Sequence, residues 1–173
     1  QIEGGRFALK RTVGERVVVE ADVFAEGHDV VVAVLRHRAA SAATWTEVPM
    51  EPLGNDRWRA AFTVVALEPH RYTVEGRVDH FLTWRHGLTK RLAAGTLEAV
   101  DLLGGARLVE EAAGRAAGDA GARLGAAAVR LAGHEPLEAR ARYALDEDLR
   151  ALVASHPDRG QAAGLGRELV VDV

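Results

Sequence analysis

The densest group of side chains capable of chemistry lies in residues 78–91, which read VDHFLTWRHGLTKR. Two histidines, two arginines, a lysine and a tryptophan fall within this stretch. Asp79, His80 and His86 invite comparison with metal ligands, but the first two would point to opposite faces of a strand, and the spacing matches no zinc motif. We therefore expect no metal and no cofactor. Instead, His80 is expected to be partly buried in a β-sandwich, and His86 to cap or hydrogen-bond the turn from strand to helix.

Acidic and hydroxyl side chains form no recognisable catalytic set. Glycoside chemistry needs one protonated and one ionised carboxyl group across a cleft, whereas Glu110 and Glu111 are typical of a solvated helix face. Ser41 and Ser155 are the only serines, and neither lies in a GxSxG motif. No glycine-rich phosphate loop is present, because GLGRE near the C-terminus lacks a following helix. The sequence therefore predicts no catalytic residue in this chain.

Alternating apolar residues predict that the first half of the chain is a β-sheet domain. Val17, Val19 and Val23 share one face of a strand over residues 16–24. Further strands are predicted at residues 30–36, 44–50, 57–64 and 72–84, with turn-forming residues at 51–57. Five strands with short connections indicate an immunoglobulin-like β-sandwich. The strand at residues 30–36 is apolar on both faces, so it is either central or covered on its outer side.

Helical periodicity replaces the strand pattern in the second half of the chain. Residues 106–133 are rich in alanine and glycine and predict two helices with a break near residues 118–121. A last helix is predicted to begin after an Asp146 N-cap and to end before Pro157. Residues 168–173 return to a strand pattern. The class is therefore α+β, with strands at residues 1–84, an inserted helical bundle at 85–160, and a final strand within 161–173.

Aromatic rings are the usual means by which a β-sandwich binds sugars. Trp58 and Tyr72 are in phase with aliphatic neighbours, which favours core packing. For Trp84, core packing and an exposed contact surface are both open. The candidate residues for an interface or a glycan contact are Trp84, Arg85, His86, Val31 and Leu35.

The composition indicates a compact globular chain. Of its 173 residues 48% are hydrophobic, and 25 acidic against 22 basic residues give a net charge of -3. The charges are interspersed and no apolar run is long enough to cross a bilayer, so we expect no nucleic-acid partner and no membrane partner. Cysteine is absent, which fits a cytoplasmic location. The chain begins at Gln1, and we expect it to be part of a longer protein.

Three stretches of the sequence are distinctive: VEADVFAEGHDVVVAVL at residues 19–35, MEPLGNDRWRAAFTV at 50–64 and YTVEGRVDHFLTWRHGLTKR at 72–91. They resemble the N-terminal region of the bacterial α-1,4-glucan:maltose-1-phosphate maltosyltransferases, members of glycoside hydrolase family 13. The similarity extends over nearly the whole chain, and the string DHF-x-TWRHGL is its most specific part. Only the alanine- and glycine-rich stretch at residues 112–133 is too low in sequence complexity to support the resemblance.

The resemblance implies a β-sandwich interrupted by a helical bundle, and a homodimer to whose subunit contact both parts contribute. It also implies retaining transfer of maltosyl units from α-maltose 1-phosphate to α-1,4-glucans. The family's catalytic Asp and Glu belong to a (β/α)8 barrel, which needs roughly 250 residues of its own. We therefore expect the chain to be a non-catalytic N-terminal region that packs against its own barrel.

Two other functions are consistent with the residues alone. A free-standing carbohydrate-binding module would show two or more coplanar aromatic rings on a sheet face or a loop edge. A stand-alone enzyme would use the region of His80 and His86, and would turn over substrate without any further domain.

Overall fold

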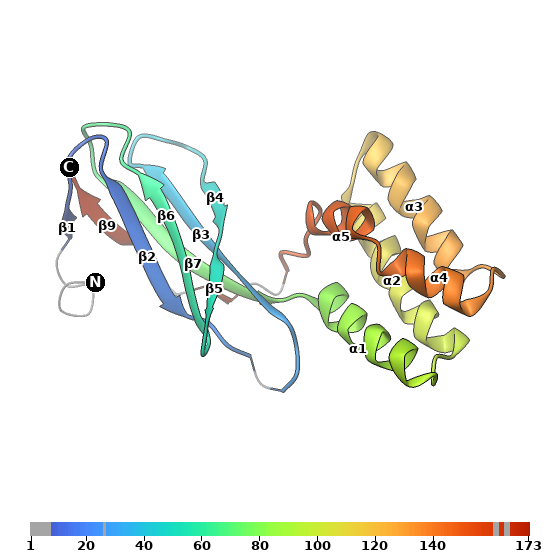
Figure 1. Ribbon diagram of the computed structural model, residues 1–173. Helices are drawn as coiled ribbons and strands as arrows, with labels where there is room; N and C mark the ends of the chain where they lie inside the picture. Colours follow the sequence, from blue (N-terminus) through green and yellow to red (C-terminus); the bar gives the residue numbers. More distant parts are fainter. Residues whose placement is uncertain (1–7, 26, 161–162, 165–166) are drawn as a thin grey trace. The chain divides into compact units, whose positions relative to one another are not determined.

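The computed structural model describes residues 8–25, 27–160, 163–164 and 167–173. The chain divides into two compact units. The described residues within 1–27, 31–78 and 161–173 form the strand unit, and residues 28–30 and 79–160 form the helical unit. Segments of the strand unit thus lie on both sides of the helices in the sequence (Figure 1). The predicted α+β class is confirmed.

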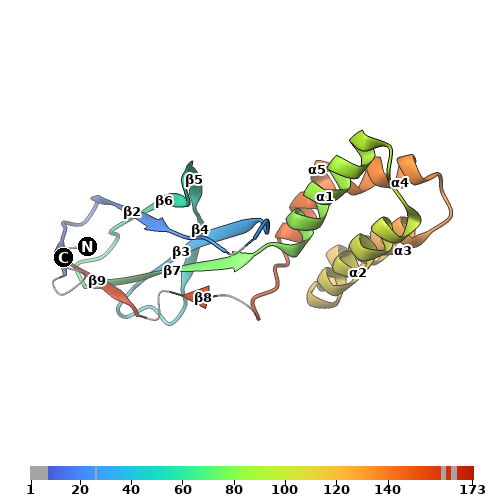
Figure 2. The same cartoon turned by 90° about the horizontal axis from the view of Figure 1, so that it is seen from below.

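The described residues of the strand unit form two sheets. The larger has the strand order β1-β9-β7-β3-β4, with β8 paired to β7, and the smaller has the order β2-β6-β5. Figure 2 shows them as separate layers. The strands are β1 (Leu9–Lys10), β2 (Arg16–Asp22), β3 (Val31–Ala39), β4 (Thr46–Pro49), β5 (Glu51–Gly54), β6 (Arg57–Thr63), β7 (His70–Val78), β8 (Ala163–Gly164) and β9 (Leu169–Asp172).

Alternate side chains of both sheets meet in one apolar core. Leu35 of β3 and Val171 of β9 are fully buried in it. Val17 of β2 and Phe62 of β6 enter from the smaller sheet. Each large apolar side chain buried in this way contributes about 1.5–3 kcal/mol. The period-two pattern of the sequence predicted these inward faces, whereas the immunoglobulin-like topology stays a prediction.

The larger sheet contains pairings between distant parts of the sequence. β3 lies between β7 and β4, so it is a central strand, one of the two alternatives that its apolar faces predicted. β9 pairs antiparallel with β7, where Tyr72 is opposite Leu169, and parallel with β1. Leu169–Asp172, which follows the helices in sequence, is therefore a strand of the larger sheet.

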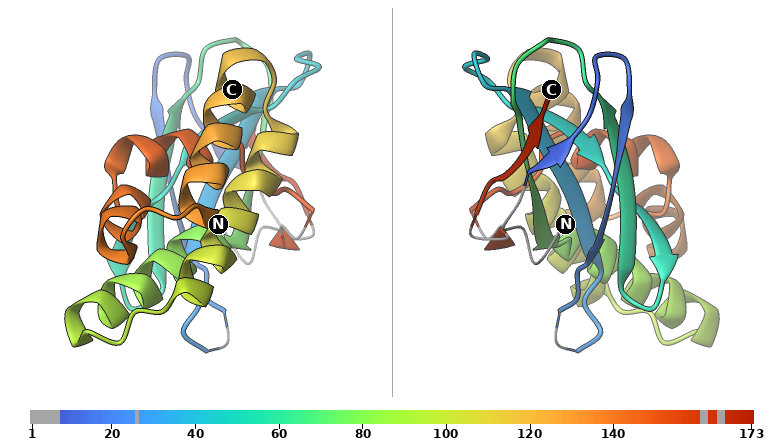
Figure 3. Two further views of the ribbon diagram at one scale, coloured as in Figure 1. Left: turned by 90° about the vertical axis from the view of Figure 1, so that its right-hand side faces the viewer. Right: turned by 90° about the vertical axis from the view of Figure 1, so that its left-hand side faces the viewer.

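The described residues of the helical unit form five helices around a second core. α2 and α3 run antiparallel and side by side (Figure 3). Leu88, Leu102, Val109, Leu124 and Leu131 are fully buried in this core. The helices are α1 (His80–Ala94), α2 (Ala99–Arg115), α3 (Gly118–Ala132), α4 (Leu137–Ala144) and α5 (Glu147–Ala154).

The predicted continuation of a strand to Trp84 is wrong, because β7 ends at Val78 and α1 begins at His80. Asp79 is the N-cap of α1, and its Oδ1 accepts a hydrogen bond from the Leu82 N–H at 2.9 Å. Buried Phe81, Arg85 and Leu88 have the i, i+4, i+7 spacing of a helix face. The apolar residues of this segment fit both the two-residue period of a strand and the 3.6-residue period of a helix. The Asp79 cap favours the helix.

Because α1 begins at His80, both His80 and His86 lie elsewhere than predicted. His80 is exposed at the first residue of α1, so the expectation that it is partly buried in the sheets is wrong. His86 is exposed in the middle of α1 and does not lie at the turn from strand to helix.

Two details of the predicted helices are close to the structure. The break between α2 and α3 falls at Ala116–Ala117, just before the predicted glycines, and Gly118 has a φ of 59°, which favours glycine. Asp146 caps α5 by accepting from the Asp148 and Leu149 N–H groups. α5 ends at Ala154, before Pro157, as predicted.

We predict that protonation of His37 destabilises the strand unit. His37 stacks on Phe62 with ring centroids 4.5 Å apart, and burial, with a smaller effect of His70, holds the pKa of His37 below 6.5. The folded chain binds this proton less readily than the unfolded chain, so stability is lost as pH falls below 6.5. His37→Gln is expected to lose less stability between about pH 7 and 5, measured by urea unfolding. Equal losses in both proteins would contradict this assignment.

Candidate functional site

Trp84, the aromatic residue of the stretch at 78–91, is half-buried within the helical unit. Its indole N–H donates to the Asp101 carbonyl at 2.7 Å, and its ring lies against Gly105 of α2. A Cβ at Gly105 would lie 2.0 Å from Cζ2 of the ring, so the indole requires glycine there. Of the two roles left open for Trp84, the structure shows core packing. A role in glycan or partner contact stays a prediction.

Arg85, the neighbouring candidate, is buried with only 8% of its surface exposed. Its Nη2 donates to the Leu145 carbonyl at 2.6 Å and to Oε1 of Glu147 at 3.0 Å. Hydrogen bonds from Arg150 and then from Arg85 lower the pKa of Glu147. Arg85 therefore connects α1 to the segment between α4 and α5, whereas His86 is exposed on the same helix.

The two apolar candidates lie in β3. Leu35 is fully buried and Val31 is half-buried. The core of the strand unit accounts for the apolar character of Leu35. Whether β3 also contributes to a subunit interface stays a prediction.

An arginine–tryptophan cluster on the larger sheet was not foreseen. The guanidinium carbons of Arg36 and Arg38 lie 5.3 Å and 4.8 Å from the ring centroid of Trp45. Arg36 also pairs with Glu75, and Arg38 donates to the Ala42 carbonyl at 3.0 Å. The alternate arginines of β3 could have been read as one face of a strand, but their stacking on Trp45 depends on tertiary structure. The ring is thus engaged within its own unit.

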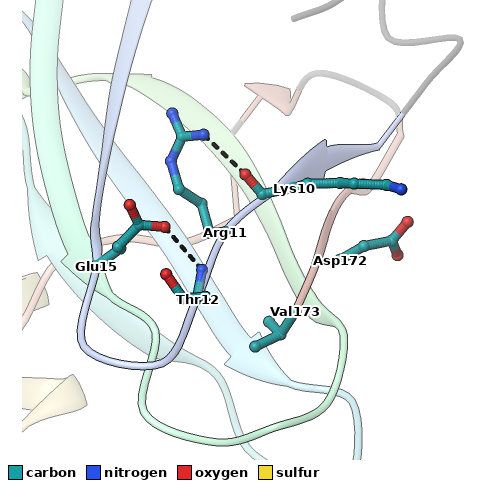
Figure 4. A pocket seen from close by; sticks show the side chains of 6 residues that line it. All are labelled: Lys10, Arg11, Thr12, Glu15, Asp172 and Val173. Atoms are coloured by element: carbon teal, nitrogen blue, oxygen red, sulfur yellow. Dashed lines mark hydrogen bonds between the residues drawn. The ribbon is translucent and has the colours of Figure 1, made fainter.

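A cleft of about 530 Å³ lies at the end of the strand unit where β1 and β9 meet (Figure 4). Lys10, Arg11, Thr12, Glu15, Asp172 and Val173 line it. The Thr12 N–H donates to Glu15 at 2.7 Å, and Arg11 donates to the Lys10 carbonyl at 2.8 Å. Sequence reasoning could not find this cleft, because it joins residues from both ends of the chain.

The chemistry of the cleft does not match that of a glycosidase pair. The hydrogen bond from the Thr12 backbone, followed by that from its side chain, lowers the pKa of Glu15. An acid catalyst in glycoside chemistry needs the opposite shift, towards a protonated carboxyl at neutral pH. Glu15 is therefore an ionised acceptor that shapes the turn between β1 and β2.

Neither a metal site nor a membrane-spanning helix is found in the described part of the chain. No group of three or more histidine and carboxylate side chains there could hold a metal ion. None of the helices described is both long and apolar enough to span a membrane.

The fold is that of an α+β region in which a helical unit interrupts a strand unit. All residues from 1 to 173 match the family model described as alpha-1,4-glucan:maltose-1-phosphate maltosyltransferase, domain N/S. The chain belongs to this family. The resemblance inferred from the sequence is therefore confirmed.

Similar proteins with the same name come from several bacteria. The chain is 42% identical to the alpha-1,4-glucan:maltose-1-phosphate maltosyltransferase of Chlorobaculum tepidum over 174 residues, which is 100% of this chain and 26% of that protein. It is 42% identical to the Myxococcus xanthus protein, over 99% of this chain and 27% of the relative. It is 35% identical to the Rhodospirillum rubrum protein, over 100% of this chain and 27% of that protein. The chain thus spans about a quarter of the length of these curated relatives.

We predict that Gly105→Ala destabilises the helical unit by about 1–3 kcal/mol, because the added Cβ forces the Trp84 ring to move. Gly104→Ala is the matched control on the same helix. A Cβ at Gly104 meets Trp84 only at 3.8 Å, so this change should be neutral or stabilise by up to about 1 kcal/mol. Urea unfolding measures both variants. Equal stability of the two would show that the close contact with the indole is not important.

Proposed function

We propose that the chain is the non-catalytic N-terminal part of a maltosyltransferase that extends α-1,4-glucans from maltose 1-phosphate. The strongest support is the match of all 173 residues to the domain N/S model, with relatives at 35–42% identity that bear this enzyme's name. In this reaction the bond between maltose C1 and the phosphate oxygen breaks, a new α-1,4 bond forms to the glucan, and inorganic phosphate leaves.

Catalysis in this proposal belongs to the part of the full-length protein outside the chain. About three quarters of each relative lies beyond the matched region, since the match covers 26–27% of its length. The cleft of the strand unit offers Glu15 with a lowered pKa, where acid catalysis would need a raised one. The charged candidate Arg85 already binds Leu145 and Glu147 within its own unit. The role of the chain is therefore domain packing and assembly.

The proposed enzyme is a homodimer, and the exposed side of α2 is a suitable contact surface. Val100 is 63% exposed and Leu103 is 50% exposed, and they lie one turn apart on this helix. Val129 of α3 is 73% exposed. Exposed apolar side chains grouped on helices are typical of protein contacts.

A free-standing carbohydrate-binding module is the weaker alternative. Phe24, at 73% exposure, is the only largely exposed aromatic side chain in the described residues. Trp45 is stacked with two arginines, and Trp58 donates its indole N–H to the Val23 carbonyl at 3.0 Å. The pair of coplanar exposed rings that such a module would use is not found in the described part of the chain. Titration calorimetry of the chain with maltoheptaose is expected to give no heat.

The full-length protein is expected to release inorganic phosphate from α-maltose 1-phosphate and to lengthen a maltohexaose acceptor by two glucose units per transfer. The chain of residues 1–173 alone is expected to release none. A phosphate assay and mass spectrometry of the glucan measure both results, and glucose 1-phosphate serves as the control donor. No transfer by the full-length protein would disprove the enzyme assignment, and turnover by the chain alone would disprove its non-catalytic role.

The double variant Val100→Glu and Leu103→Glu is expected to convert the full-length dimer to a monomer, because it places like charges on both copies of the contact. Light scattering measures the mass. Arg142→Glu, at an exposed position of α4 outside this surface, is the control for charge alone. A dimer that survives the double variant would place the subunit contact elsewhere.

A further inference from the structure

The loop between β6 and β7 holds apolar side chains in solvent although the loop itself is fixed. Val65 is 72% exposed and Leu67 is 83% exposed. The Val65 N–H donates to Nε2 of buried His70 at 3.4 Å, and Nδ1 of that ring donates to the Glu68 carbonyl at 2.9 Å. An N–H group only donates and a carbonyl only accepts, so these contacts require the hydrogen on Nδ1. His70 thus fixes the loop from inside the core.

The far side of the same loop is anchored to the turn after β3. The Glu68 carboxylate accepts from the Ser41 N–H at 2.9 Å and from its hydroxyl at 2.7 Å. These bonds lower the pKa of Glu68. The Ala40 N–H donates to the Pro69 carbonyl at 2.8 Å. Ordering a loop costs conformational entropy, yet here it leaves two apolar side chains in water.

A third apolar side chain lies on the adjoining turn between β1 and β2. The Gly14 N–H donates to the Val64 carbonyl at 2.8 Å, and the Val64 N–H donates to the Glu15 carbonyl at 3.0 Å. This backbone pairing places Val13, which is 50% exposed, on the turn beside the loop. We call Val13, Val65 and Leu67 the end patch. Grouped exposed apolar residues of this kind mark interaction sites.

The end patch continues into the cleft of Figure 4. Thr12 and Glu15, on either side of Val13 and Gly14, line the cleft together with Val173. The cleft adds the charged side chains of Lys10, Arg11 and Asp172. An apolar centre with a charged rim is the usual anatomy of a protein interface.

We propose that the end patch and the adjoining cleft are the docking site for the polypeptide that follows Val173 in the full-length protein. The inference rests on the proposed function, because it takes the chain as one part of a longer enzyme. The relatives have about three quarters of their length outside the match. Val173 itself lines the cleft, so the following segment enters the docking site without a long connection. The occupant is an apolar surface of that segment, seated on Leu67 and Val65.

A photo-crosslinking experiment on the full-length protein tests this assignment. Benzoylphenylalanine replaces Leu67, because this side chain is 83% exposed in the chain alone and would contact the occupant directly. After irradiation, the protein is expected to stay at monomer mass on a denaturing gel, and mass spectrometry is expected to find position 67 joined to a peptide from beyond Val173. A band of twice the mass would assign the patch to a second copy and overturn the proposal. Absence of any crosslink would also overturn it.

Phe24 provides the matched control position. It is 73% exposed and follows β2 at the end of that strand opposite the β1–β2 turn. Benzoylphenylalanine at position 24 should not capture the peptide that position 67 captures. Capture of the same peptide with equal yield from both positions would mean non-specific labelling and would disprove the docking site.

Hydrogen exchange gives a second measurement that does not depend on the photoreaction. Leu67→Asp is expected to increase deuterium uptake in the captured peptide several-fold, whereas Phe24→Asp is expected to leave it unchanged. Unchanged uptake in both variants would contradict the proposal. The transferase assay is run on the same protein, so a crosslink without transfer would refute only the enzyme assignment, and transfer without a crosslink would refute only the docking site.

Discussion

The strand unit depends on the pairing of β7 along both of its edges. On one edge β7 pairs with β3 in continuous register from Val78 opposite Val31 to His70 opposite Ala39. On the other edge it pairs with β9 at residues 70–72 and with β8 at residues 75–76. Backbone polar groups inside a protein must find partners. Because β8 and β9 follow the helical unit in sequence, the sheet is complete only when segments from both sides of the insertion are present.

Three buried polar side chains stabilise the fold by binding main-chain atoms. His70 fixes the β6–β7 loop, Arg85 binds the carbonyl of Leu145, and the third, Arg140, donates to the Leu131 carbonyl at 3.0 Å and to the Glu135 carbonyl at 2.9 Å. Helix ends leave carbonyls without intrahelical partners, and a buried arginine supplies several donors at once. A bond of this charged type is worth about 1.5–3 kcal/mol. Arg85, the most buried basic residue in the stretch at 78–91, is therefore buried because it holds neighbouring helices together.

The sequence was sufficient for features that depend on local pattern. The inward faces of β2, β3 and β6 follow from alternation, and the start of α5 follows from the Asp146 cap. It failed at residues 79–84, where the apolar positions suit either period and a single aspartate decides. The candidate Trp84 was identified, but its glycine partner on α2 depends on how two helices approach each other. The cleft between β1 and β9 was beyond sequence reasoning for the same reason, since the residues that form it are near neighbours only in space.

The distance in sequence between β7 and β9 has a consequence for biosynthesis. Arg71 of β7 and Glu168, the residue just before β9, form an ion pair at 3.0 Å and are 97 positions apart. As the chain leaves the ribosome, β7 is complete long before β9 exists, whereas the helices can form from local contacts in the interval. During that time β7 has an open edge, the kind of surface on which strands of other molecules add. The helical segment therefore sets how long the nascent sheet stays unprotected.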